Sequence, residues 1–151
     1  MNLKLLAGFL LCGALTACSQ TITTSAVVID EAFLTQNFKD WIHSKALVKV
    51  AQLGGSCKIL NREREYYSCS VSADDEVIDL GFGYRAKGDY AIMLSSTVAH
   101  LWPPSDESVA AGKHVPSLQM ELEEWVVETI PNEAVVRRTR SIVDYDYEKS
   151  F

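Results

Sequence analysis

The chain has 151 residues, of which 48% are hydrophobic and 23% charged, and its formal net charge is −6. This length suits one domain of ordinary size, and the composition is that of a folded globular chain rather than a disordered or collagenous one. The surplus of acidic side chains argues against nucleic-acid binding, because phosphates require a basic surface.

Residues 1–17 have the layout of an export signal. Lys4 is followed by an apolar run from Leu5 to about Leu15 and then by small residues. The apolar run has about 10 residues, half of what a helix needs to cross a bilayer, so it does not predict a transmembrane span.

The signal ends in Leu15-Thr16-Ala17-Cys18. This motif resembles the lipobox of bacterial lipoproteins. The resemblance implies that diacylglycerol is attached to the thiol of Cys18, that the signal is cut just before this residue, and that the new amino group is acylated. Several acyl chains give stable attachment to a membrane. The alternative is an ordinary signal peptide with an incidental cysteine beside its cleavage site.

The resemblance also bears on localisation. In Gram-negative lipoproteins an aspartate after the acylated cysteine resembles an inner-membrane retention signal, and this chain has Ser19 instead. We therefore expect an outer-membrane lipoprotein that faces the periplasm. The next residues are polar and rich in hydroxyls, so residues 18–29 are expected to form a flexible tether and residues 30–151 a single globular domain.

The four cysteines divide by position. Cys12 would leave with the signal and Cys18 would be blocked by lipid, which leaves Cys57 and Cys69. A hairpin centred on Glu63 places these two thiols opposite each other, and an oxidising periplasm favours their pairing. A redox pair or a metal site is rejected, because the spacing is wrong and no histidine lies nearby.

The first half of the domain is expected to contain a helix and an antiparallel meander. Asp30 can cap a helix with apolar positions over residues 33–42, whose continuation over 46–50 is left open as helix or strand before the stop at residues 54–55. After the cysteine hairpin, an Asp-Asp turn at residues 74–75 precedes an alternating strand over 78–84. Lys87-Gly88 then turns the chain into a strand over residues 90–94.

The second half begins with an irregular segment, residues 98–116, which holds three of the four prolines. Ser117 is expected to cap a clear amphipathic helix that ends at Pro131-Asn132, and residues 134–147 are expected to be extended. The predicted fold is therefore α+β: an antiparallel sheet of about four to five strands, an N-terminal helix, and a second amphipathic helix before the last strand.

The sequence offers no catalytic motif, so no catalytic residue, cofactor or metal is assigned. His43, His100 and His114 lack metal-binding spacing. If the irregular segment folds back, His100 and His114 can approach each other, with Asp106 or Glu107 as a third ligand. Acidic pairs such as Glu123-Glu124 are interpreted as solvated surface.

Two features favour binding. Trp102 precedes a stiff proline pair and is either an interface anchor or a plug at the edge of the core. Glu121, Glu124 and Glu128 lie on the polar face of the second helix. Removal of Lys4 with the signal leaves 13 basic against 20 acidic residues, a net charge of −7 that favours a cationic partner.

The functional prediction is a non-catalytic protein-binding module. Its size and expected cellular location resemble those of lysozyme-inhibitor and toxin-immunity lipoproteins. A more specific hypothesis is therefore an immunity or inhibitor protein that acts on a cationic periplasmic toxin or peptidoglycan hydrolase. A second binding hypothesis is an accessory part of envelope assembly, secretion or conjugation machinery. The hypothesis from a different class is an envelope hydrolase.

Overall fold

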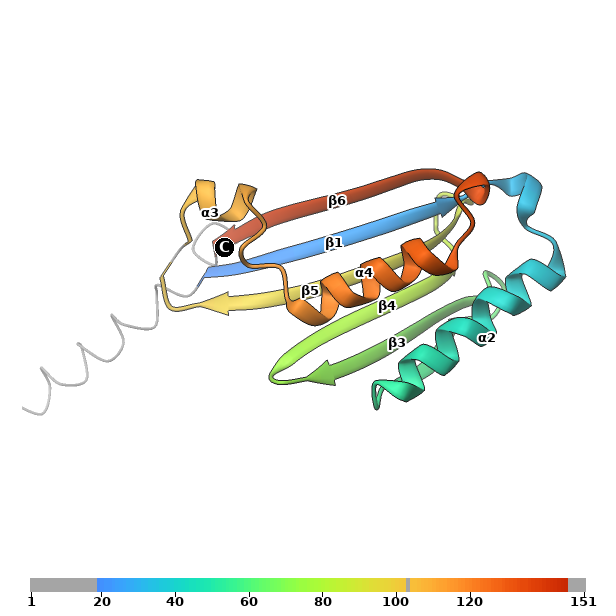
Figure 1. Ribbon diagram of the computed structural model, residues 1–151, viewed down its shortest axis with the longest axis horizontal. Coiled ribbons are helices and arrows are strands. Elements are labelled where there is room, and N and C mark those ends of the chain that lie inside the picture. The colour runs from blue at the N-terminus through green and yellow to red at the C-terminus, as the bar shows by residue number, and fades with distance from the viewer. Residues whose placement is uncertain (1–18, 103, 147–151) are drawn as a thin grey trace, which may run out of the picture.

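The computed structural model describes residues 19–102 and 104–146, and their strands form one antiparallel sheet of six strands in the order β2-β3-β4-β5-β1-β6 (Figure 1). The strands are β1 (Ser19–Ile29), β2 (Ser56–Asn61), β3 (Tyr66–Ala73), β4 (Glu76–Tyr84), β5 (Tyr90–His100) and β6 (Val135–Asp146). The helices are α2 (Gln36–Gln52), α3 (Asp106–Ala110) and α4 (Ser117–Thr129), with short 3-10 turns η2 (Glu31–Phe33) and η3 (Asn132–Ala134). The α+β class is confirmed, with more strands than expected. The export signal, Cys12 and Cys18 lie outside the described residues.

The extra strand is β1. Residues 19–29 pair with β5 on one side and with β6 on the other, so the expectation of a flexible tether is wrong for these residues. The hydroxyls of Ser19, Thr21, Thr23 and Ser25 lie on the buried side of β1. The alternation that marks a strand is therefore present here, but in polar residues, and apolar periodicity could not detect it.

Helices α2 and α4 cover the same face of the sheet (Figure 1). The buried stripe of α2 is Ile42, Ala46 and Val50, at the four-residue spacing of one helix face. The open question about residues 46–50 is thus answered: the helix continues, and the chain turns at Gly54, where φ is +72°. The helix begins later than expected, because Asp30 caps η2 and the Thr35 hydroxyl accepts a hydrogen bond at the start of α2.

The meander is confirmed. β2, β3, β4 and β5 are joined by successive hairpins, and Asp74 and Asp75 both have positive φ in the tight turn between β3 and β4. Buried side chains of β4 alternate with exposed ones in its first half and pack beneath the two helices; they are Ile78, Leu80 and Phe82.

The segment over residues 98–116 is more regular than expected. β5 extends to His100, and the Ser105 hydroxyl caps the short helix α3. The buried stripe predicted for α4 is confirmed at Leu118, Leu122 and Val126, but Ser117 is not its cap. A carboxylate from β4 fills that role: Glu76 accepts hydrogen bonds from the backbone N–H groups of Ser117, at 3.1 Å, and Leu118, at 2.9 Å.

Candidate functional site

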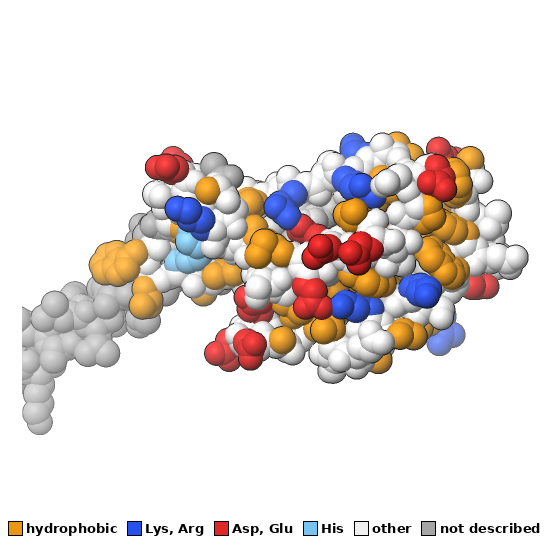
Figure 2. Space-filling view, in the orientation of Figure 1, with side chains coloured by type: hydrophobic (Ala, Val, Ile, Leu, Met, Phe, Trp, Pro, Cys, Tyr) orange, Lys and Arg blue, Asp and Glu red, His pale blue; other side chains and the backbone are white. Residues whose placement is uncertain are grey.

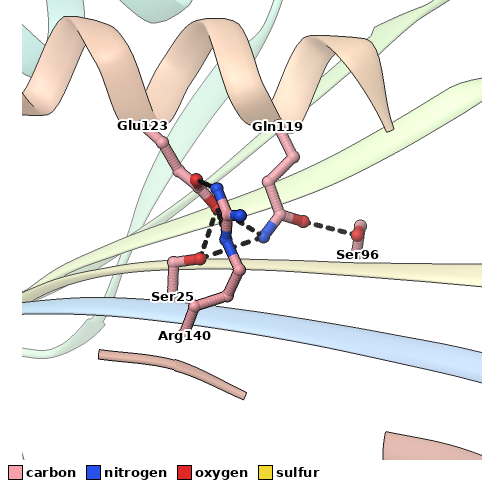
Figure 3. Close-up of polar contacts among 5 residues, drawn as sticks. All are labelled: Ser25, Ser96, Gln119, Glu123 and Arg140. Carbon is pink, nitrogen blue, oxygen red and sulfur yellow. Dashed lines mark hydrogen bonds and ion pairs between the residues drawn. The ribbon is translucent and has the colours of Figure 1, made fainter. Parts of the chain in front are cut away.

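A polar network joins α4 to three strands of the sheet (Figure 3). At its centre Gln119, which is fully buried, accepts a hydrogen bond from the Ser96 hydroxyl at 2.5 Å and donates to the Ser25 hydroxyl at 3.3 Å. Glu123, one turn further along α4, accepts hydrogen bonds from Ser25 and Gln119 and forms an ion pair with Arg140 of β6. The network therefore ties α4 to β5, β1 and β6.

The contacts of Glu123 determine its charge state. Partial burial favours the neutral acid, but hydrogen bonds from Arg140, Ser25 and Gln119, together with the charge of Arg140, outweigh burial and hold the pKa of Glu123 below its usual value. A carboxylate with a lowered pKa is a weak base and stays ionised at neutral pH. This arrangement suits a structural ion pair.

An open groove of about 240 Å³ runs beside the network, between α4 and β6. Its walls include Ile92, Leu94 and Val126, and Glu123 and Arg140 lie at its polar side. The groove combines apolar walls with a fixed charge pair, a combination found in binding sites for side chains or small ligands.

The carboxylates expected to bind a partner lie on the exposed side of α4, seen in the centre of Figure 2 with Lys and Arg side chains on both sides of them. Glu121 accepts a hydrogen bond from Lys49 of α2 at 2.7 Å, which neutralises part of this face. Glu124 and Glu128 are exposed. Glu124 and Glu128 are therefore the residues of this set on which an interaction with a cationic partner would depend.

Trp102 is not part of the acidic face. It follows β5, at the end of the sheet beside α3, and its residue is 77% exposed. It therefore does not plug the core, and its role as an interface anchor stays a prediction. The structure does not bring Trp102 together with the α4 carboxylates.

His100 and His114 do meet, with ring centroids 4.7 Å apart and ring planes at 80°. Each Nε2 also has a hydroxyl neighbour at 2.9 Å, Thr21 for His100 and Ser108 for His114. Within the described ranges, no group of three or more His, Cys, Asp or Glu side chains is arranged to hold a metal ion. The contacts of the pair link β1, β5 and the segment that carries α3.

His43 of α2 lies in an aromatic cluster that the sequence did not reveal. Its ring lies 4.6 Å from that of Tyr67 and 5.2 Å from that of Phe82, and Nε2 is 3.0 Å from the Tyr90 hydroxyl. Burial lowers the pKa of His43 and raises that of Tyr90, so both groups are neutral at neutral pH.

Lys39 is a second buried polar group on α2. Its Nζ donates a hydrogen bond to Glu65 at 2.7 Å, which raises the pKa of Lys39, and it lies 5.5 Å from the centroid of the Tyr84 ring. Spacing in the sequence indicates this burial: Lys39 precedes Ile42 by three residues, which places it on the buried stripe of α2.

Cys57 and Cys69 form the predicted disulfide. They lie directly opposite each other on β2 and β3, with Cα atoms 3.9 Å apart. The bridge closes the hairpin at the edge of the sheet, with Cys69 buried beneath α2.

Comparisons with protein-family models, curated proteins and solved structures found no match to this chain. Among the described residues, no helix has the length and apolarity required to cross a membrane.

Proposed function

We propose that this protein is an outer-membrane lipoprotein, anchored through acyl chains on Cys18 and facing the periplasm, whose domain acts by binding a protein partner. The observation that carries the proposal is the lipobox-like sequence Leu15-Thr16-Ala17-Cys18. The Cys57–Cys69 disulfide supports it, because such bridges persist in oxidising compartments such as the periplasm.

Binding, rather than catalysis, is supported by the contacts of the polar side chains. Glu123 forms an ion pair with Arg140. The Ser25 hydroxyl donates its hydrogen bond to the Glu123 carboxylate and not to a neutral imidazole base. His100 and His114 contact each other and neighbouring hydroxyls. These contacts hold the helices and the α3 segment on the sheet, which is a structural role.

The proposed binding surface is the exposed side of α4, and its carboxylates are the groups to replace in a test. Glu124 and Glu128 lie beside the groove-forming part of α4 and carry charge that attracts a cationic partner and accelerates its association. An inhibitor or immunity protein acting on a basic envelope enzyme would use such a surface. An accessory role in envelope machinery is the other binding function.

The test is affinity capture from detergent-solubilised membranes with wild type and two double variants. Glu124→Gln/Glu128→Gln removes two charges from α4, and Asp79→Asn/Glu63→Gln removes two exposed charges from β4 and the β2–β3 turn. The proposal predicts a partner that is lost with the first variant and kept with the second. One stoichiometric basic enzyme indicates an inhibitor, and several envelope-machinery components indicate an assembly role.

The rival function is an envelope hydrolase. A hydrolytic activity of the purified protein that is lost on substitution of His100 or His114 would overturn the binding proposal. Equal capture of the same proteins by wild type and by the α4 variant would show that the acidic face is not the binding surface.

A further inference from the structure

The sheet begins at the residue that follows the proposed anchor. Ser19 is the first residue of β1 and is bonded to Cys18. It is paired with His100 of β5 and with Asp146 of β6, and only 4% of the residue is exposed. Acyl chains on Cys18 would therefore be attached at the start of β1, a strand fixed between β5 and β6, without the flexible spacer that the composition suggested.

Two exposed hydrophobic residues leave the sheet at the same end. β1 and β5 are antiparallel and Ser19 is paired with His100, so the start of β1 and the end of β5 lie side by side at one end of the sheet. The Cα atoms of a paired Ser19 and His100 lie about 5 Å apart, and each further residue adds about 3.8 Å. The Cα atom of Leu101 thus lies at most about 9 Å from that of Ser19, the residue bonded to Cys18.

Leu101 and Trp102 are 80% and 77% exposed, more than any other large hydrophobic residue in the described ranges. Figure 2 shows hydrophobic side chains gathered at this end of the molecule, and the acidic side chains over α3 lie on a different side of it. A water-exposed Leu-Trp pair is unfavourable in solution, whereas tryptophan is enriched where a membrane meets water.

We propose that Leu101 and Trp102 insert into the interfacial layer of the phospholipid bilayer that holds the acylated Cys18. This inference rests on the proposed lipid anchor and adds an orientation to it. The strands run along the long axis of the molecule (Figure 1), so a domain that contacts lipid at the start of β1 directs its opposite end, with η2 and η3, into the periplasm. The acidic face of α4 then lies along the side of the domain, open to a partner.

The test uses the mature lipoprotein in vesicles of phosphatidylethanolamine and phosphatidylglycerol, with and without a phosphatidylcholine brominated near the headgroup end of its acyl chains. Bromine quenches tryptophan at short range. The chain has three tryptophans, of which Trp41 and Trp125 are half-buried on α2 and α4. We expect the brominated lipid to quench wild type, and the quenching to be lost in Trp102→Phe and kept in the matched variant Trp125→Phe.

Two outcomes overturn the inference. If brominated lipid leaves wild type unquenched, or quenches Trp102→Phe as strongly as wild type, Leu101 and Trp102 do not enter the bilayer. The mass of the N-terminal peptide separates this failure from failure of the anchor. An unacylated Cys18 refutes the proposed function and the docking together, whereas an acylated Cys18 with an unquenched Trp102 refutes the docking alone.

Discussion

Replacing Glu76 by glutamine is expected to destabilise the domain through the N-terminus of α4. The carboxylate accepts hydrogen bonds from the backbone N–H groups of Ser117 and Leu118 and from the Ser117 hydroxyl. The residue at the N-cap position, Pro116, forms no side-chain cap, so Glu76 is the group that satisfies these donors.

The size of the effect follows from charge and geometry. A negative charge at a helix N-terminus is worth about 0.3–1 kcal/mol, and hydrogen bonds to a charged acceptor are roughly twice as strong as neutral ones. Glutamine keeps an acceptor oxygen but loses the charge. We therefore expect Glu76→Gln to lower the free energy of unfolding at pH 7 by about 1 kcal/mol, a shift in Tm of about 3 °C for a domain of this size.

The same contacts give the effect a pH dependence. Backbone hydrogen bonds from Leu118 and Ser117 outweigh burial and lower the pKa of Glu76 in the folded protein. A lowered folded-state pKa stabilises the protein above the pKa of the unfolded chain, and this stabilisation is lost as the pH falls through the folded-state pKa. The difference between wild type and Glu76→Gln is therefore largest at neutral pH and shrinks in acid.

Urea denaturation at several pH values measures this difference. Glu124→Gln is the matched control, because it removes one carboxylate from the exposed side of the same helix. A Glu76→Gln effect that does not change with pH, or that is no larger than the Glu124→Gln effect at pH 7, would refute the assignment of Glu76 as the cap of α4.

Two further predictions concern the β2–β3 hairpin. Replacing Cys57 and Cys69 by serine should lower the free energy of unfolding by about 3 kcal/mol on the loop-entropy estimate, since the bridge closes a loop of sequence separation 12. Reduction of wild type should lower the free energy of unfolding in urea by a similar amount. No change on reduction would contradict the stabilising role of the bridge. At Gly83, where φ is +135°, an added Cβ would lie 2.4 Å from the carbonyl oxygen of Glu65, whereas Gly88, at φ +90°, has nothing within 4 Å. Gly83→Ala should therefore lower the free energy of unfolding by about 1–3 kcal/mol more than Gly88→Ala, which introduces only the strain of a positive φ. Equal destabilisation of the two variants in thermal unfolding would refute the close approach of the hairpin to β4.

Local patterns were sufficient for much of the fold. The meander, the disulfide and the buried stripe of α4 follow from alternation, turn residues and spacing, and the structure confirms them. Apolar periodicity does not predict β1, because its buried side carries hydroxyls, two of which bond partners from distant parts of the chain: Thr21 contacts His100, and Ser25 contacts Glu123. No pattern within β1 specifies those partners.

The same limit applies to the candidate site. Gln119, Glu123 and Arg140 form no motif in the sequence, and their network exists because α4 crosses the strands that bring Ser25 and Ser96 beneath it. For the same reason the sequence favours the nearest hydroxyl, that of Ser117, as the cap of α4, although Glu76, a carboxylate 41 residues away, is the cap. Contacts between residues so far apart in the sequence depend on tertiary structure, which the periodicity of a single sequence does not predict.

The proposed function depends on the lipid anchor at Cys18, and the mass of the mature N-terminus tests this anchor. We expect wild-type protein from bacterial membranes to begin at an acylated Cys18, and Cys18→Ser to remain an unprocessed precursor. A mature, soluble Cys18→Ser product, or a wild-type N-terminus without acyl chains, would contradict the anchor.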